Sequence, residues 1–152
     1  MNSRKELNRD NGSGEPYFVD SNIFFYAKIM DGEYGVACAE VLRRIEDRRI
    51  LAATSTLVVL EVANSLRKFG LTKQVKDVVD SIFSLELRIL EMSGFDVRNA
   101  IQISQRLNIS PYDCAHVAVM QHAKIGKVVS ADKDFDRVPG IRRKDPKTFS
   151  AT

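Results

Sequence analysis

Short apolar runs of β-forming residues alternate with amphipathic helical patterns along this chain, and this alternation limits the fold more than any other feature. Four runs favour strands: Tyr17–Val19, Ile50–Ala53, Leu87–Leu90 and Lys127–Ser130. Strands that alternate with helices form mainly parallel sheets, which helices cover on both faces. We therefore predict a three-layer α/β/α domain around a central, mainly parallel sheet of four to five strands.

The helical patterns that separate these runs have recognisable ends. Capping residues, a proline at a first helical position and glycines beyond the last turn mark where the helices begin and end. The expected helices cover Val36–Arg48, a segment from Ser55 or Thr56 to Lys68, a segment from Thr72, Val97–Leu107 with Asp96 as its cap, and a segment from Ser110-Pro111 to near Lys124.

The composition fits one globular domain. The chain has 152 residues, 44% of them hydrophobic and 28% charged, with a net charge of +3. Residues 1–16 are polar and contain several turn-forming residues. We predict a flexible N-terminal tail over 1–16, a single domain over 17–147 and a C-terminal tail over 148–152.

Cysteine and histidine positions argue against a zinc site. Cys38 and Cys114 lie in helical patterns without metal-binding spacing, and His116 and His122 lie six positions apart in one expected helix. No apolar run is long enough to span a membrane, and the N-terminus lacks the apolar segment of a signal peptide. We expect a cytoplasmic protein with reduced thiols and no membrane partner.

Carboxylates stand where a parallel sheet binds its ligands. Asp20 ends the first expected strand, and Asp132 follows the fourth. Glu61 lies in the first two turns of the helix that leaves the second strand, and Asp113 begins the helix that leads into the fourth. All these places lie at the carboxyl edge of the sheet. The topology therefore predicts that four carboxylates converge there, with Asp134 close enough to be a fifth.

A cluster of carboxylates is typical of a divalent metal site, because unpaired negative charges repel one another. Mg²⁺ and Mn²⁺ prefer oxygen ligands, and such an ion can polarise a phosphodiester and ready a water molecule for attack. We expect Asp20, Asp113 and Asp132 to hold the ion. We expect Glu61 to bind or orient the attacking water.

Each acid also has a purely structural interpretation. Asp113 fits the acidic position of a helix capping box, and Asp132 with Asp134 fits a solvated loop. Glu61 is harder to explain in this way, since it interrupts an apolar helical stretch where an unpaired buried carboxylate is costly. Three polar neighbours can support the site or make only turn hydrogen bonds: Ser21, Asn22 and Ser130.

The chain resembles the PIN-domain family over residues 17–144, in four segments that keep the family's order and spacing. These segments are FVDSNIFFYA, TSTLVVLEVANSL, SPYDCAHVAVM and VVSADKDFDRVPGI. Within that family the chain looks most like the VapC-type toxin ribonucleases of prokaryotic toxin–antitoxin pairs. The N-terminal tail is a departure, because the first strand of the family commonly begins almost at the initiator methionine.

The resemblance implies an endoribonuclease that uses Mg²⁺ or Mn²⁺ to hydrolyse RNA. It matches the four family acids to Asp20, Glu61, Asp113 and Asp132, and makes Asp134 a frequent additional acid. It also implies a homodimer or higher homo-oligomer. A small antitoxin protein would inhibit the enzyme by placing its C-terminal segment in the acidic groove.

An RNA substrate needs cations to guide its backbone toward an acidic pocket. The basic residues chosen for this role also fit solvated helix faces; they are Arg43, Arg44, Arg67, Lys68, Arg142 and Arg143. Two other functions stay open: a catalytically silent PIN-like module that binds RNA or acts as a scaffold, and a PIN nuclease of RNA processing.

Two unrelated metal enzymes fit the sequence less well. A haloacid-type phosphatase needs an Asp-x-Asp after its first strand, but Asp20 is followed by Ser21 and Asn22. A primase-type metal fold would leave Asp20 and Asp113 unexplained.

Overall fold

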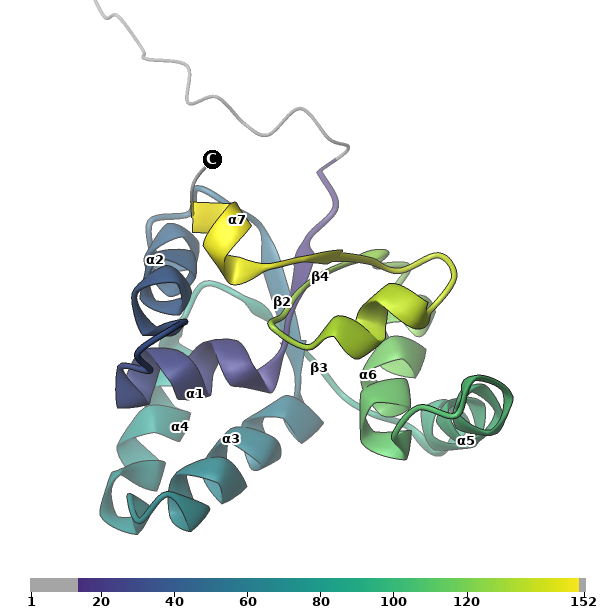
Figure 1. The fold of residues 1–152 in the computed structure, drawn as a ribbon, viewed down its shortest axis with the longest axis horizontal. Coiled ribbons are helices and arrows are strands. Elements are labelled where there is room, and N and C mark those ends of the chain that lie inside the picture. Colours follow the sequence, from purple (N-terminus) through teal and green to yellow (C-terminus); the bar gives the residue numbers. More distant parts are fainter. Residues whose placement is uncertain (1–13, 151–152) are drawn as a thin grey trace, which may run out of the picture.

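A sheet of five parallel strands lies at the centre of the computed structural model, which describes residues 14–150 (Figure 1). The strands follow the order β3-β2-β1-β4-β5, and every neighbouring pair is parallel. They are β1 (Tyr17–Val19), β2 (Ala52–Ser55), β3 (Arg88–Leu90), β4 (Lys127–Val129) and β5 (Arg142–Lys144).

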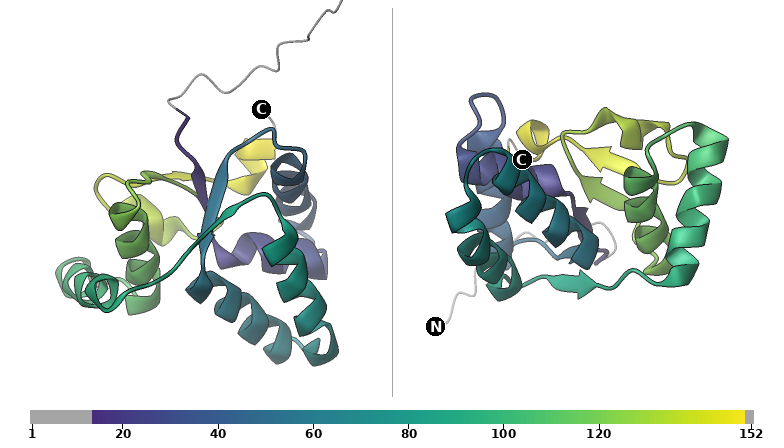
Figure 2. Two further views of the ribbon diagram at one scale, coloured as in Figure 1. Left: turned by 180° about the vertical axis from the view of Figure 1, so that it is seen from behind. Right: turned by 90° about the horizontal axis from the view of Figure 1, so that it is seen from below.

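Two groups of helices cover this sheet. In Figure 1 and in the turned views of Figure 2, α5 and α6 lie on one side, and the remaining α-helices lie on the other. The helices are α1 (Ser21–Ile29), α2 (Gly35–Glu46), α3 (Thr56–Lys68), α4 (Val75–Ser84), α5 (Gly94–Leu107), α6 (Pro111–His122) and α7 (Pro146–Ser150), with short 3₁₀ helices η1 (Thr72–Gln74) and η2 (Lys133–Arg137). The predicted three-layer α/β/α domain is confirmed.

The central strands are apolar throughout because helices cover both of their faces. Phe18 and Val19 of β1 and Val128 and Val129 of β4 are all fully buried. Three residues per strand are therefore enough to anchor the middle of the sheet. The short strands also bring their carboxyl ends, and the residues that follow, into one place.

Helix α1 was not expected from the sequence. The chain turns directly from β1 into this helix, and the Asp20 side chain caps it by accepting a hydrogen bond from the Ser21 amide at 2.8 Å. The turn places Ser21 and Asn22 in the first turn of a helix instead of in a loop. Both side chains are thereby held close to the end of β1.

Most boundaries differ from the prediction by one to three residues, and two of the differences have a clear cause. Strand β2 covers Ala52–Ser55 instead of Ile50–Ala53, because the preceding turn, in which Arg48 has a φ of 57°, extends further along the chain. Helix α5 is capped by Ser93, whereas Asp96 is the acid of the resulting capping box and bonds back to the Ser93 amide at 2.9 Å.

The last helix of the described chain packs against the first strand. Phe149 of α7 is only 3% exposed, and its ring lies 5.0 Å from the ring of Tyr17 in an edge-on arrangement. The packed structure therefore includes part of the segment 148–152. Most of the segment 1–16 lies outside the described residues.

Cys38 and Cys114 are both buried and free, as expected of structural thiols. Within the described residues, no helix combines the length and apolar character needed to cross a membrane.

Candidate metal centre

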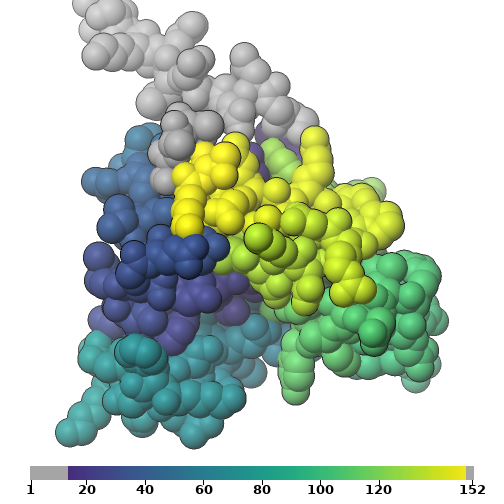
Figure 3. Space-filling view, in the orientation of Figure 1, coloured from purple at the N-terminus to yellow at the C-terminus, as the bar shows by residue number. Residues whose placement is uncertain are grey.

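The predicted acids converge at the carboxyl ends of β1 and β4. These strands are neighbours, and the order β3-β2-β1-β4-β5 shows that the chain builds the sheet outward from β1 in both directions. Ligand sites of parallel sheets lie at such a switch point, beyond the strand ends. Asp20 follows β1 directly, and the loop after β4 carries Asp132. In the space-filling view, α1 in purple and the yellow-green segment after β4 lie side by side (Figure 3).

Asp20 is held by hydrogen bonds from three directions. Its Oδ1 accepts from the Ser21 amide, and its Oδ2 accepts from Asn22 Nδ2 at 3.0 Å and from Ser130 Oγ at 2.6 Å. The residue is 3% exposed. Burial raises the pKa of Asp20 above its ordinary value, and the nearby His116 and these hydrogen bonds offset only part of that effect. Asp20 is thus a rigid, buried carboxylate.

Asn22 and Ser130 join α1 to the loop after β4. Asn22 Nδ2 donates to Ser130 Oγ at 3.0 Å, and Asn22 Oδ1 accepts from the Ala131 amide at 3.2 Å. Ser130 Oγ also accepts from the Asp132 amide at 3.0 Å. The two side chains therefore fix the position of Asp132 relative to Asp20.

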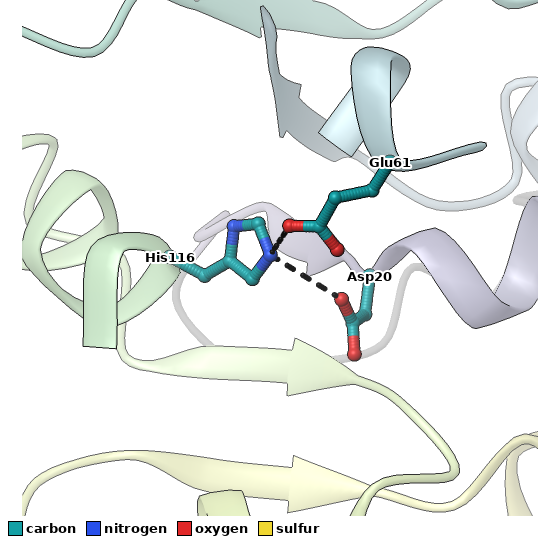
Figure 4. A group of neighbouring side chains, drawn as sticks. All are labelled: Asp20, Glu61 and His116. Atoms are coloured by element: carbon teal, nitrogen blue, oxygen red, sulfur yellow. Dashed lines mark ion pairs between the residues drawn. The ribbon is translucent and has the colours of Figure 1, made fainter. Parts of the chain in front are cut away.

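Glu61, in the second turn of α3, points toward both Asp20 and His116 (Figure 4). Its Oε2 accepts from Ser21 Oγ at 3.0 Å, and its Oε1 lies 2.6 Å from Nε2 of His116. The same Nε2 lies 3.8 Å from Oδ1 of Asp20. Asp20, Glu61 and His116 form what we call the buried group, because their donor atoms lie within 4.8 Å of one another.

His116 was missed by the sequence analysis, which compared its spacing only with His122. The side chain is completely buried in α6. Burial lowers the pKa of His116, but Glu61 and the charges of Asp20 and Asp113 outweigh burial, so that the net shift is upward. A signal was available: His116 lies three residues after Asp113, which places both on one helix face.

A second set of carboxylates lies beside the buried group. Asp113, Asp132 and Asp134 each offer an oxygen within 4.8 Å of the other two, and we call them the open group because all three are only partly buried. Asp132 caps η2 by accepting from the Asp134 amide at 2.9 Å. The capping-box interpretation of Asp113 does not hold, since the Ser110 hydroxyl accepts from the Tyr112 amide instead.

The two groups form one electrostatic unit. The pKa of Asp113 is raised to about 7, first by burial and then by the charges of Asp132, Asp20 and Glu61, while His116 lowers it. The protein has thus gathered carboxylates that do not all ionise easily without a counter-charge. This donor set fits a divalent cation, which would favour the ionised form of every acid in it.

Five of the six predicted RNA-binding cations are not gathered around this centre. Arg43 and Arg44 stand near the end of α2, where both pair with Glu40. Arg142 lies opposite Lys127, at the amino end of β4. Arg67 and Lys68 end α3, about 10 Å along the helix axis from Glu61.

Arg143, the sixth predicted cation, lies beside the site and is held by hydrogen bonds and ion pairs within the protein. Its guanidinium donates to the Ser130 carbonyl at 3.0 Å and to the carboxylates of Asp136 and Asp145. The side chain is 11% exposed. Arg143 therefore braces the loop that follows β4.

Known proteins share both the sequence pattern and the fold. A VapC ribonuclease of Mycobacterium bovis is 26% identical over 133 residues, which cover 87% of this chain and 88% of that protein. The crystal structure of VapC20 of Mycobacterium tuberculosis, described as a sarcin-ricin loop cleaving toxin, matches 79% of this chain and 92% of that one with a TM-score of 0.68 and 17% identity. A second similar structure is the VapBC2 complex of Rickettsia felis bound to a DNA fragment from its promoter. One chain of that complex aligns with this chain with a TM-score of 0.64 and 18% identity, and the alignment covers 84% of this chain and 96% of that chain.

The family model of the PIN domain matches residues 17–141, from the first residue of β1 to the residue before β5. This range contains both the buried group and the open group. The chain belongs to the PIN domain family.

Proposed function

We propose that this protein is a metal-dependent endoribonuclease that hydrolyses RNA phosphodiesters, and that it is the toxin of a VapBC-type toxin–antitoxin pair. The observation that carries this proposal is the convergence of Asp20, Glu61, Asp113 and Asp132 at the carboxyl ends of β1 and β4. The relatives named as VapC ribonucleases support the choice of RNA as the substrate.

The metal would be Mg²⁺ or Mn²⁺, held by Asp20, Asp113 and Asp132 with Asp134 beside them. A bound divalent ion supplies a Lewis acid, which polarises the phosphodiester and favours an ionised water molecule. Glu61 reaches the centre from α3 and would orient the attacking water or accept its proton.

Three neighbours act through these acids. Ser130 and Asn22 hold the Asp20 carboxylate, and Ser21 holds Glu61. With the two carboxylates fixed by hydrogen bonds, little reorganisation is needed when substrate binds.

The cleavage assay that tests this proposal compares Asp20→Asn, Asp113→Asn and the exposed-surface control Asp77→Asn on a mixed RNA substrate. Cleavage by the wild type and by Asp77→Asn should require Mg²⁺ or Mn²⁺ and stop with EDTA. The two site variants should lose at least about a hundredfold in rate, since each removes a carboxylate that would hold the metal ion at the reacting phosphate. Full metal-dependent cleavage by either site variant would refute the assignment.

A catalytically silent module would bind RNA without metal-dependent turnover, so the same assay separates that alternative. A nuclease of RNA processing would cleave as well. Expression in cells distinguishes it: a toxin stops growth, and co-expression of its small antitoxin restores growth, whereas a processing enzyme does neither.

Similar solved structures support an antitoxin partner, because they include toxin–antitoxin complexes of Rickettsia felis and Klebsiella pneumoniae. A basic C-terminal segment would match the acidic centre in charge. Binding of such a segment should weaken steeply with salt and compete with Mn²⁺.

We also propose a homodimer. Large apolar side chains remain exposed on the described surface, among them Leu60, Phe69, Phe83, Phe95 and Ile101. Leu60 and Phe83 lie on α3 and α4, which pack against each other, and an apolar face on adjoining helices is the kind of surface that a second copy can cover. Sedimentation equilibrium of the purified chain tests the proposal.

RNA contacts close to the acids need a cation near them. Lys133 is exposed at the start of η2, between Asp132 and Asp134. We add it to the six predicted cations. Of these, Arg143 lies beside the site but is engaged by Ser130, Asp136 and Asp145, and the other five would contact more distant parts of a large RNA.

A further inference from the structure

We propose that Nε2 of His116 is a metal ligand, and that the buried group is a mixed nitrogen–oxygen site that favours Mn²⁺ over Mg²⁺. This inference rests on the proposed function, because Asp20 is a ligand in both, and it makes Glu61 a metal ligand in addition to its role toward the attacking water. It adds a ligand that an all-carboxylate site does not have.

Three buried atoms without a hydrogen bond support the inference. Within the described residues, Oε1 of Glu61 and both ring nitrogens of His116 are buried without a hydrogen-bond partner. Nε2 and Oε1 lie 2.6 Å apart and pair as ions when His116 is protonated, although their alignment does not make a hydrogen bond. A buried polar group that lacks a hydrogen bond destabilises the folded state. A cation bound to both Nε2 and Oε1 satisfies two of the three atoms at once.

The His116 ring is aimed into the group and held there. Figure 4 shows the ring extending from α6 toward the carboxylates of Asp20 and Glu61, with Nε2 as the nearest ring atom. The ring packs against Phe18 of β1, with 5.8 Å between the ring centroids. The side chain is fully buried, so it has little freedom to turn away.

Helix α6 contributes one residue to the buried group and one to the open group. Asp113 and His116 are one turn apart on α6, so that Asp113 faces the open group and His116 the buried group. A shift of α6 would move a ligand of each group together. This arrangement couples the two groups mechanically as well as electrostatically.

The nitrogen determines which ion is preferred. Mg²⁺ takes oxygen ligands in near-octahedral geometry and retains several waters, whereas imidazole suits transition metals. A site with two carboxylates and one imidazole therefore discriminates between Mn²⁺ and Mg²⁺, which an all-oxygen site does weakly.

The decisive experiment is pulsed electron paramagnetic resonance of Mn²⁺ bound to the metal-free full chain. Wild type and the control His122→Gln should show hyperfine coupling to ¹⁴N, and labelling with ¹⁵N-histidine should replace it by ¹⁵N coupling. His116→Gln should lose the coupling. Calorimetric titration should show Mn²⁺ affinity falling about tenfold or more in His116→Gln, while Mg²⁺ affinity changes less than about threefold.

The wild-type spectrum alone is decisive even if His116→Gln does not fold. Bound Mn²⁺ without histidine coupling in the wild type would overturn the inference. If RNA cleavage still depended on metal and on Asp20, the proposed function would stand while His116 lost its role. If the spectrum shows histidine coupling but the protein cleaves no RNA, His116 is a metal ligand and the proposed nuclease function is wrong.

Discussion

The Ser130 hydroxyl donates to Oδ2 of Asp20 at 2.6 Å and so ties the loop after β4 to the end of β1, across 110 residues of sequence. Ser130 is completely buried, and its Oγ also accepts from Asn22 and from the Asp132 amide. One hydroxyl thus sets the spacing between two of the proposed metal ligands.

Ser130→Ala should destabilise the protein and weaken metal binding. The substitution removes three hydrogen bonds and leaves the buried Asp20 carboxylate with fewer donors, which should cost about 1–3 kcal/mol of the free energy of unfolding. Urea denaturation and Mn²⁺ titration measure the two effects. The control Ser84→Ala removes a hydroxyl bond on an exposed helix face and should change neither. Unchanged stability of Ser130→Ala would contradict this view of the loop.

Metal affinity should rise with pH. In the metal-free protein the pKa of Asp113 is raised to about 7 by burial, followed by the charges of Asp132 and Asp20. A metal ligand must be ionised, so binding below that pKa displaces a proton. Mn²⁺ affinity should therefore increase between about pH 6 and pH 8, and deprotonation of His116, whose pKa is also raised, should add to the increase. Calorimetry in buffers of different ionisation enthalpy counts the released protons, and an affinity independent of pH would argue against Asp113 as a ligand.

Asp113→Asn should stabilise the metal-free protein at alkaline pH. Between the ordinary pKa of 3.8 and about 7, the folded state holds a proton on Asp113 that the unfolded chain has lost. The free energy of unfolding therefore falls as pH rises through this range. Removing the charge should recover about 1–2 kcal/mol near pH 8, after allowance for solvent screening.

Metal should reverse this difference in stability between the wild type and Asp113→Asn. Mn²⁺ binds the folded state and should raise the melting temperature of the wild type more than that of Asp113→Asn. The surface control Asp77→Asn should behave as the wild type in both experiments. A metal-free Asp113→Asn that melts below the wild type at pH 8 would show that the carboxylate is structural.

Lys133→Ala should weaken RNA binding and reduce its salt dependence. A lysine that contacts one phosphate contributes about one unit to the slope of log affinity against log salt concentration. The measurement uses the Asp20→Asn background, so that the RNA survives, with the exposed Lys73→Ala as the control. An unchanged slope would exclude a phosphate contact by Lys133.

The convergence of the acids could be predicted because it depends on local patterns. Each acid adjoins a short apolar strand or the start of a helix, and the topology of a parallel sheet places all these points at one edge. The assignment of Asp20, Glu61, Asp113 and Asp132 to one place therefore needed no knowledge of side-chain packing.

The contacts of His116 could not be predicted in this way. Its nearest charged atom belongs to Glu61, which is 55 positions earlier in the chain and on a helix of the opposite layer. Spacing along the sequence reports neighbours on one helix, and it is silent on neighbours across the sheet.

Helix α1 and strand β5 could not be predicted because their amino-acid composition is atypical of such elements. Helix α1 reads SNIFFYAKI, which is apolar over most of its length and shows little of the polar face that reveals a surface helix. Strand β5 consists of Arg142, Arg143 and Lys144, none of them a β-former, and is held by its backbone pairing with β4.

The pairing of β1 with β4 has a consequence for the cell that makes this protein. The strands are neighbours in the sheet but are separated by most of the chain, so a nascent polypeptide on the ribosome presents Asp20 long before Ser130 and Asp132 emerge. Until translation is nearly complete, no fragment can assemble the full set of ligands. The ligand set is therefore a property of the whole folded chain and of no shorter piece of it.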